Sequence, residues 1–262
     1  MDIQLTGKRA IVCGSTQGIG KAAALELASL GASVTLVSRN ETTLQQMKSE
    51  LKSGAGQQHA TIAVDFNEPD SLKEKIAGYI RQFGPAQILV NNSGGPKGGL
   101  IVEAELQEFV NTFSQHVLCN HILTQAVLPG TKAAKFGRVV NIISTSVKQP
   151  IPGLGVSNTV RAAVASWSKT LAAEVARFGI TVNNILPGMT KTGRLDYVIR
   201  TKAERAGKTI EEVTNEMIAE IPAGRYAEPR EIAVVIAFLC SPAASYVNGV
   251  SLQVDGGRTT CL

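Results

Sequence analysis

The chain alternates short apolar runs with longer amphipathic stretches from one end to the other. The apolar runs are rich in β-branched residues and do not alternate with polar ones, which predicts strands buried on both faces at residues 9–13, 33–37, 60–64, 87–90, 138–143, 181–185 and 251–254. The amphipathic stretches predict helices at 18–29, 41–53, 69–83, 104–127, 157–178 and 229–240. Repeated β-α-β order predicts an α/β fold with a doubly wound, parallel, seven-stranded sheet and helices on both faces.

The pattern shows no linker, repeat or low-complexity segment, so residues 1–262 are expected to form a single domain. One long interruption, 188–228, separates the sixth strand from the last long helix and has a helical pattern of its own at about 194–219. Ligands bind outside the carboxyl ends of the strands in such sheets. Residues 189–228 are therefore predicted to form a helical cap over a substrate site.

The composition is sufficient for a sizeable hydrophobic core, since 44% of the residues are hydrophobic. Cys13, Cys119, Cys240 and Cys261 form no C-x-x-C pair, so we expect no metal site, three buried core cysteines in a reducing compartment and one exposed tail thiol. The N-terminal stretch has only a four-residue apolar run and predicts neither a signal peptide nor a membrane span. A cytoplasmic location with no membrane partner is expected.

The net charge of +5 is concentrated in the predicted cap. Six bases and two acids lie between Lys191 and Lys208, and Tyr197 is the single aromatic residue among them. A surface that binds nucleic acid would interleave Lys and Arg residues with aromatic side chains on which nucleobases stack, so no nucleic-acid partner is expected. The basic cap indicates either a small anionic or polar substrate or simply a solvated helix face.

A glycine-rich loop joins the first predicted strand to the first predicted helix. Gly14, Gly18 and Gly20 are spaced G-x-x-x-G-x-G, which lets the backbone approach a pyrophosphate at the helix N-terminus. The alternative is an ordinary tight turn. In its strand–turn–helix context the loop predicts a Rossmann-type dinucleotide site.

The second predicted strand ends in Ser38 and Arg39, where many dinucleotide sites place an acid against the adenosine ribose. A hydroxyl and a guanidinium suit a 2′-phosphate, which favours NADP(H) over NAD(H). The alternative is a solvent-facing arginine at a strand end.

Six stretches together resemble the short-chain dehydrogenase/reductase family, and its 3-oxoacyl-ACP reductase-like members in particular. They are CGSTQGIG (13–20), VDF (64–66), NNSG (91–94, where the family has NNAG), GRVVNIIST (137–145), VNNILPGMTKT (182–192) and SYVNGVSLQVDGG (245–257). The resemblance covers nearly the whole chain and implies an oxidoreductase. It also implies cofactor contacts from Gly14, Ser15, Thr16, Gln17, Gly18, Ile19, Gly20, Asp65, Asn91, Ser93, Gly94, Arg161, Pro187, Gly188, Thr190 and Thr192.

The family's chemistry uses a serine, a Tyr-x-x-x-Lys pair and a helix asparagine, and this chain departs from that set. Ser144 occupies the serine position, but Ser157 and Arg161 stand where the tyrosine and lysine are expected. The helix asparagine falls on His116. None of the four tyrosines has a lysine four positions later, so no other segment supplies the pair.

These substitutions change the expected proton chemistry. A serine hydroxyl is far less acidic than a phenol, so Ser157 can orient a carbonyl but donates a proton poorly. Arg161 keeps the cation that holds the nicotinamide ribose, and His116 titrates near neutrality and could relay protons through water. In the alternative interpretation, His116 is an ordinary helix histidine, Ser157 and Arg161 are surface residues, and Ser144 is a hydrogen-bonded strand end.

Three functions therefore remain open at this point. The first is NADP(H)-dependent hydride transfer between the nicotinamide and a carbonyl or alcohol substrate, with an atypical acid/base set of Ser144, Ser157, Arg161 and His116. The second is a dinucleotide-binding regulatory protein without turnover, and the third is non-redox chemistry on the same scaffold. Members of the family are usually tetramers built through the helices predicted at 104–127 and 157–178, so a homotetramer or homodimer is expected.

Overall fold

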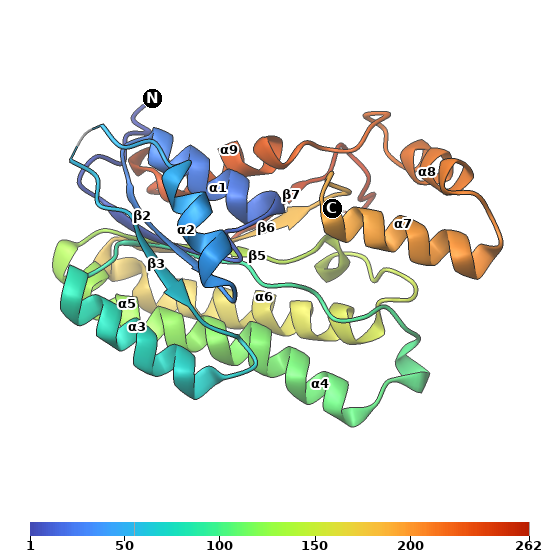
Figure 1. The fold of residues 1–262 in the computed structure, drawn as a ribbon, viewed down its shortest axis with the longest axis horizontal. Helices are drawn as coiled ribbons and strands as arrows, with labels where there is room; N and C mark the ends of the chain where they lie inside the picture. The colour runs from blue at the N-terminus through green and yellow to red at the C-terminus, as the bar shows by residue number, and fades with distance from the viewer. Residues whose placement is uncertain (55, 262) are drawn as a thin grey trace.

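The computed structural model describes residues 1–54 and 56–261 and contains one parallel sheet between two helical layers (Figure 1). The strand order is β3-β2-β1-β4-β5-β6-β7. The strands are β1 Arg9–Cys13, β2 Ser33–Ser38, β3 Ala60–Ala63, β4 Ile88–Asn91, β5 Gly137–Ile142, β6 Ile180–Pro187 and β7 Ser251–Val254. The predicted fold class is confirmed. The order reverses between β1 and β4, and in open α/β sheets ligands bind at such a point, in the crevice outside the carboxyl ends of the strands.

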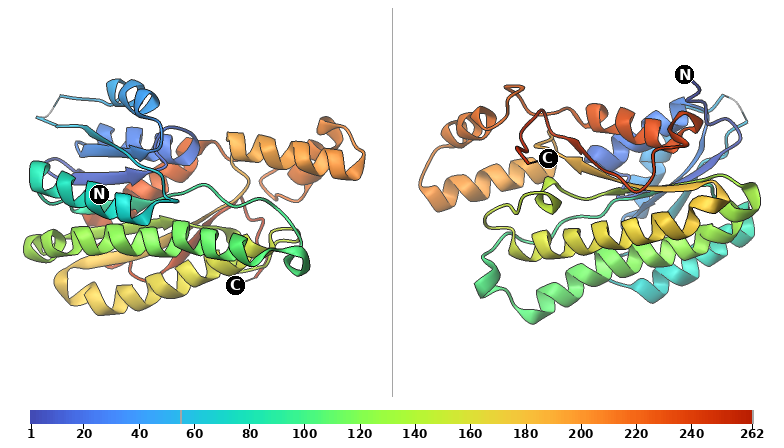
Figure 2. Two further views of the ribbon diagram at one scale, coloured as in Figure 1. Left: turned by 60° about the horizontal axis from the view of Figure 1, so that its bottom comes forward. Right: turned by 180° about the vertical axis from the view of Figure 1, so that it is seen from behind.

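The helices cover both faces of the sheet (Figure 2). They are α1 Gly18–Ser29, α2 Glu41–Ser49, α3 Pro69–Phe83, α4 Leu106–Phe113, α5 Cys119–Ala134, α6 Gly155–Val175, α7 Gly193–Ala206, α8 Ile210–Ala219 and α9 Pro229–Cys240. Helices α1, α2 and α9 bury their apolar faces on one side, and α3, α5 and α6 bury theirs on the other. Strands β1, β2, β4, β5 and β6 are therefore shielded from water on both faces, which explains their mostly apolar sequences. The edge strand β7 is only partly buried, with Leu252 38% exposed, so the prediction that 251–254 is buried on both faces is wrong.

Two predicted helices differ from the observed ones. The helix expected at 104–127 is divided into α4 and α5 by a π-helical turn, Ser114–Leu118, and α5 continues through Pro129 to Ala134. The helical pattern expected at 194–219 is divided by Gly207, whose φ of 62° ends α7 in the left-handed region. A periodic pattern cannot locate a π turn, because the extra residue is absorbed without a polar break.

Helices α7 and α8 project beyond the carboxyl end of the sheet (Figure 1). They bury a small apolar cluster of their own that includes Leu195, Ile199, Val213 and Met217.

Cys13, Cys119 and Cys240 are buried and Cys261 is exposed, as predicted. Within the described part of the chain, no helix combines the length and the apolarity needed to span a membrane.

Candidate functional site

The glycine loop after β1 forms a tight cradle at the crevice. Gly14 and Gly18 have φ of 58° and 53°, and a Cβ on Gly20 would lie 2.1 Å from the Gly14 carbonyl oxygen. Helix α1 begins at Gly18, and the side chain of its N-cap residue, Gln17, caps none of the first N–H groups. These N–H groups and the positive end of the helix dipole are the features that bind a pyrophosphate. The loop therefore fits a dinucleotide on the evidence of its backbone.

Other predicted residues of this loop have distinct positions. Ser15 is fully buried and its hydroxyl donates to the Val37 carbonyl, so its side chain is committed to the sheet. Thr16 reaches the neighbouring strand end, where its hydroxyl lies 3.2 Å from the Ser38 hydroxyl. Ile19 packs against the core beneath the loop. The Ser15 and Thr16 hydroxyls thus both reach the last two residues of β2, and Thr16 meets the Ser38 side chain.

Arg39 and Asp65 follow the carboxyl ends of the neighbouring strands β2 and β3. Arg39 is exposed at the end of β2, and it has no ion pair with any carboxylate among the described residues. Asp65 follows β3 and accepts two hydrogen bonds at one carboxylate oxygen, from the backbone and side-chain nitrogens of Asn67. An exposed guanidinium such as that of Arg39, one residue after Ser38, can bind a phosphate as a bidentate ligand.

A ladder of asparagines crosses the sheet under the crevice. The Asn91 amide donates to Asn141 at 2.8 Å, and the Asn141 amide donates to Asn184 at 3.0 Å. Asn184 in turn donates to the hydroxyls of Ser168 and Ser251. The three asparagines are direct neighbours in the parallel register. Sequence reasoning identified Asn91 alone, although polar residues at matching depth in three apolar strands were a usable signal.

The buried His116 and the half-buried Ser93 form a hydrogen-bonded pair just after β4. His116 lies in the π-helical turn and is 2% exposed, and its Nδ1 is 2.6 Å from the Ser93 hydroxyl. Its Nε2 is buried and has no hydrogen-bond partner in the described part of the chain. Burial, and next the positive charge of Arg161, hold the pKa of His116 well below the usual 6.5, although the Gly94 backbone opposes the shift. The imidazole is therefore neutral at physiological pH, and the expectation that His116 titrates near neutrality is wrong because the side chain is buried beside a cation.

Arg161 and Ser157 are buried on α6, so the surface interpretation of this pair is wrong. Ser157 is 9% exposed and Arg161 is 8% exposed. One guanidinium nitrogen of Arg161 donates to the Ile142 carbonyl at 2.8 Å. Burial, and then the charge of Arg194, lower the pKa of Arg161 to about 10, so the cation persists at neutral pH. Ser144 is half-buried at the end of β5, where its hydroxyl accepts a hydrogen bond from the Ser146 backbone.

The segment after β6 brings the remaining predicted residues to the crevice. The Thr190 hydroxyl donates to the Gly188 carbonyl, and the Thr192 hydroxyl donates to the Thr190 carbonyl. A Cβ on Gly188 would lie 2.6 Å from the Asp255 Cα, so only glycine fits at the close approach after Pro187. These contacts fold the backbone into the turn that leads to α7.

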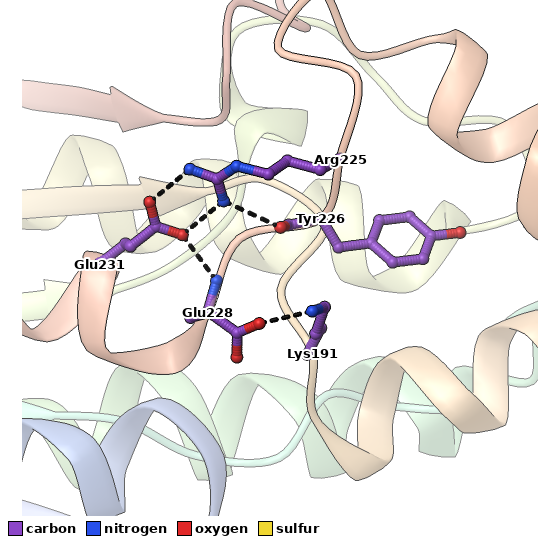
Figure 3. A network of polar contacts seen from close by, with 5 residues as sticks. All are labelled: Lys191, Arg225, Tyr226, Glu228 and Glu231. Carbon is purple, nitrogen blue, oxygen red and sulfur yellow. Dashed lines mark hydrogen bonds and ion pairs between the residues drawn. The ribbon is translucent and has the colours of Figure 1, made fainter.

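Two ion pairs lie at the start of α9, and one of them, Lys191–Glu228, joins it to this turn (Figure 3). Arg225 binds both carboxylate oxygens of Glu231 at 2.7 Å, and Glu231 also accepts from the Glu228 backbone. Lys191 pairs with Glu228. The Arg225 side chain is the main reason that the pKa of Glu231 falls to about 2. Lys191 is one of the six basic residues counted in the predicted cap, and here it has an exposed ion-pair partner.

Comparisons with known proteins agree with this architecture. Residues 14–259 match the family described as Enoyl-(Acyl carrier protein) reductase. The chain is 33% identical over 255 residues to 3-oxoacyl-[acyl-carrier-protein] reductase FabG of Vibrio cholerae, covering 97% of this chain and 98% of that protein. It belongs to the short-chain dehydrogenase/reductase family.

Two further relatives show the range of this oxidoreductase family. The chain is 31% identical to gluconate 5-dehydrogenase of Gluconobacter oxydans, with 98% of this chain and 97% of that protein covered. The crystal structure of L-sorbose reductase from Gluconobacter frateurii, complexed with NADPH and L-sorbose, has a TM-score of 0.93 at 32% identity over the full length of both chains. As a short-chain dehydrogenase/reductase, the protein thus shares its whole fold with reductases of different carbonyl compounds.

Proposed function

We propose that this short-chain dehydrogenase/reductase catalyses NADP(H)-dependent hydride transfer between the nicotinamide and a carbonyl or alcohol carbon, with an atypical acid/base set. When bound, NADP(H) supplies or accepts the hydride. Gly14, Gly18 and Gly20 would hold its pyrophosphate, and Ser38 and Arg39 would hold the 2′-phosphate. The NADPH in the related L-sorbose reductase complex supports this cofactor.

The Ser93–His116 pair carries the proposal. The family's tyrosine is replaced by Ser157, so another group must exchange a proton with the substrate oxygen. His116 has one imidazole nitrogen on the Ser93 hydroxyl and a second that is buried without a partner, beside a fixed cation. A serine hydroxyl donates and accepts, so the pair can pass a proton in either direction, directly or through water.

The other polar side chains have separate roles in this proposal. Ser144 and Ser157 orient the substrate oxygen through their hydroxyls. Arg161 contacts the nicotinamide ribose, and its positive charge stabilises the negative charge that develops on the oxygen during reduction. Because burial removes water from this cation, its field at the reacting oxygen is stronger than that of a surface arginine. The remaining cofactor contacts are those predicted at Asp65, Asn91, Ser93, Gly94, Pro187, Gly188, Thr190 and Thr192.

The test is NADPH oxidation with a panel of aldehydes, diketones and oxo acids, with the alcohol product identified by mass spectrometry. Wild-type protein is expected to turn over at least one of them, and His116→Gln is expected to lose about 10²–10⁴-fold in kcat with NADPH affinity retained. His121→Gln is the matched control, because His121 is exposed on α5 five residues later. NADPH binding with no turnover across the panel would contradict the proposal and favour a regulatory role.

A further inference from the structure

Two arginines from different elements converge on the glycine loop after β4. A Cβ built on Gly95 would lie 3.5 Å from one terminal nitrogen of Arg194 and 3.8 Å from one terminal nitrogen of Arg161. The two nitrogens are therefore no farther apart than the sum of these short distances. Arg161 comes from the buried side of α6, and Arg194 comes from the first turn of α7. The loop at Gly95, helix α6 and helix α7 of the cap therefore meet at one place.

Neither guanidinium has an ion-pair partner among the described residues. Ion pairs within residues 1–54 and 56–261 involve Lys21, Lys191, Lys208, Arg225, Arg230 and Arg258, and none involves Arg161 or Arg194. The hydrogen bonds of both side chains go to backbone carbonyls, from Arg161 to Ile142 and from Arg194 to Pro96 at 2.9 Å. Their full charges therefore remain at one place. Arg161 is buried, at 8% exposure, whereas Arg194 is exposed. A buried cation such as Arg161 without an ion-pair partner is unfavourable and attracts a counter-ion.

The position of Arg194 adds to the positive potential. It is the second residue of α7, at the end where the helix dipole is positive and where cations are disfavoured. Arg194 also lowers the pKa of Arg161, which shows that the two charges repel each other. An oxyanion between them would relieve both effects. The cap thus places the Arg194 cation next to the loop after β4, whereas Lys191 and Lys208 form ion pairs with glutamates.

We infer that Arg161 and Arg194 together bind the carboxylate of an oxo-acid or hydroxy-acid substrate above the Gly94–Gly95 backbone. A Cβ on Gly94 would meet no atom within 4 Å, so the space beside this loop is open. The planar fork of a guanidinium matches a carboxylate as a bidentate partner. Arg194 already connects the cap with the loop after β4 through its hydrogen bond to the Pro96 carbonyl. A carboxylate bound there would add a second connection between the cap and this loop. The inference rests on the proposed function for the reacting carbonyl, but the anion site itself can be measured without turnover.

Oxalate is a suitable probe, because it offers two carboxylates and no ketone. Its binding to the full-length protein is measured by isothermal titration calorimetry, with and without saturating NADP⁺. Arg194→Gln is expected to weaken oxalate binding by about tenfold or more. Arg200→Gln is the matched control: it removes the same charge from an exposed position on the same helix and is expected to change the affinity less than twofold.

Three results would overturn the inference. In the first, oxalate does not bind the wild-type protein. In the second, Arg194→Gln and Arg200→Gln weaken oxalate binding equally, as a diffuse surface charge predicts. In the third, NADP⁺ displaces oxalate and Arg194→Gln weakens NADP⁺ binding, which assigns the site to a phosphate of the cofactor.

Steady-state kinetics separate this inference from the proposed function. Arg194-dependent oxalate binding without any NADPH oxidation contradicts the proposed function and leaves the anion site standing. Turnover with equal kcat/KM for 2-oxobutanoate and the neutral 2,3-pentanedione contradicts the anion site alone. A preference for 2-oxobutanoate that Arg194→Gln abolishes and Arg200→Gln retains supports both.

Discussion

The Ser93 hydroxyl and the Nδ1 atom of His116 lie 2.6 Å apart, and they join the loop after β4 to the π-helical turn before α5. Both residues depart from the family pattern, which has alanine in NNAG and asparagine in the helix. The two departures meet in space as a donor–acceptor pair. A serine here satisfies a buried imidazole nitrogen that an alanine would leave unpartnered, so the two substitutions form one polar unit.

Removing one member of the Ser93–His116 pair is expected to cost more than removing both. Ser93→Ala leaves the buried Nδ1 of His116 without a partner, which should lower the free energy of unfolding by about 1–3 kcal/mol. Ser93→Ala combined with His116→Asn restores the family's residue types and should recover part of this loss. A double-mutant cycle by urea unfolding measures the coupling. Additive losses would mean that the hydrogen bond contributes nothing to stability.

The buried His116 should make stability fall on the acid side. In the unfolded chain the imidazole binds a proton near its ordinary pKa of 6.5, whereas the folded protein holds its pKa well below that value. The stability is therefore fully present above pH 6.5 and is lost as the pH falls below it, at up to about 1.4 kcal/mol per pH unit.

His116→Gln should abolish this part of the slope, as measured by urea unfolding at several pH values. His121→Gln, the exposed control, should retain it. If wild-type and His116→Gln proteins lose stability in parallel below pH 6.5, His116 is not the residue responsible.

Restoring the family's pair on α6 should raise ordinary ketone reduction. Ser157→Tyr combined with Arg161→Lys reintroduces a phenol whose pKa a neighbouring ammonium can lower, and a gain of about 10²–10⁴-fold in kcat with a neutral ketone is expected. The single Ser157→Tyr variant should gain less, because arginine differs from lysine in geometry and proton exchange. Circular dichroism and NADPH titration verify folding and binding. A folded, NADPH-binding double variant with no gain contradicts the swapped-pair explanation.

Cofactor choice should depend on Arg39. Arg39→Ala removes the guanidinium proposed for the 2′-phosphate, so the ratio of NADPH to NADH affinity should fall by about tenfold or more. The NADH affinity itself should hardly change. Lys48→Gln on the adjacent α2 removes an equal charge away from the end of β2 and serves as the control in both titrations. An unchanged ratio in Arg39→Ala would assign the 2′-phosphate to other residues.

The outer face of α4 should mediate self-association. Leu106 is 83% exposed, Val110 60% and Phe113 42%, and their spacing places them on one apolar stripe of the helix. Leu106→Glu combined with Val110→Glu should shift the expected homotetramer or homodimer to a smaller species. Sedimentation velocity measures this shift. Ile210→Glu on α8, also exposed, should leave the mass unchanged, and an equal effect of both variants would indicate non-specific association.

The sequence by itself determined the architecture of this protein. Seven apolar runs, the helices between them and the glycines at 14, 18 and 20 specify a parallel sheet with a phosphate cradle, because these features depend on local periodicity and backbone freedom. The register between Ser144 and the α6 positions also led to the prediction that Ser157 and Arg161 replace the usual pair. Such information lies in residues that are near one another along the chain.

Only the tertiary structure decided how the polar groups of the site combine. The contacts of Ser93 with His116, of Asn141 with Asn91 and Asn184, and of Arg161 and Arg194 with the space at Gly95 join segments far apart in sequence. The structure also showed that Lys191 has an ion-pair partner, whereas Arg194 has none among the described residues. Burial and charge pairing depend on three-dimensional neighbours, and they set which groups are neutral, charged or free to bind a ligand.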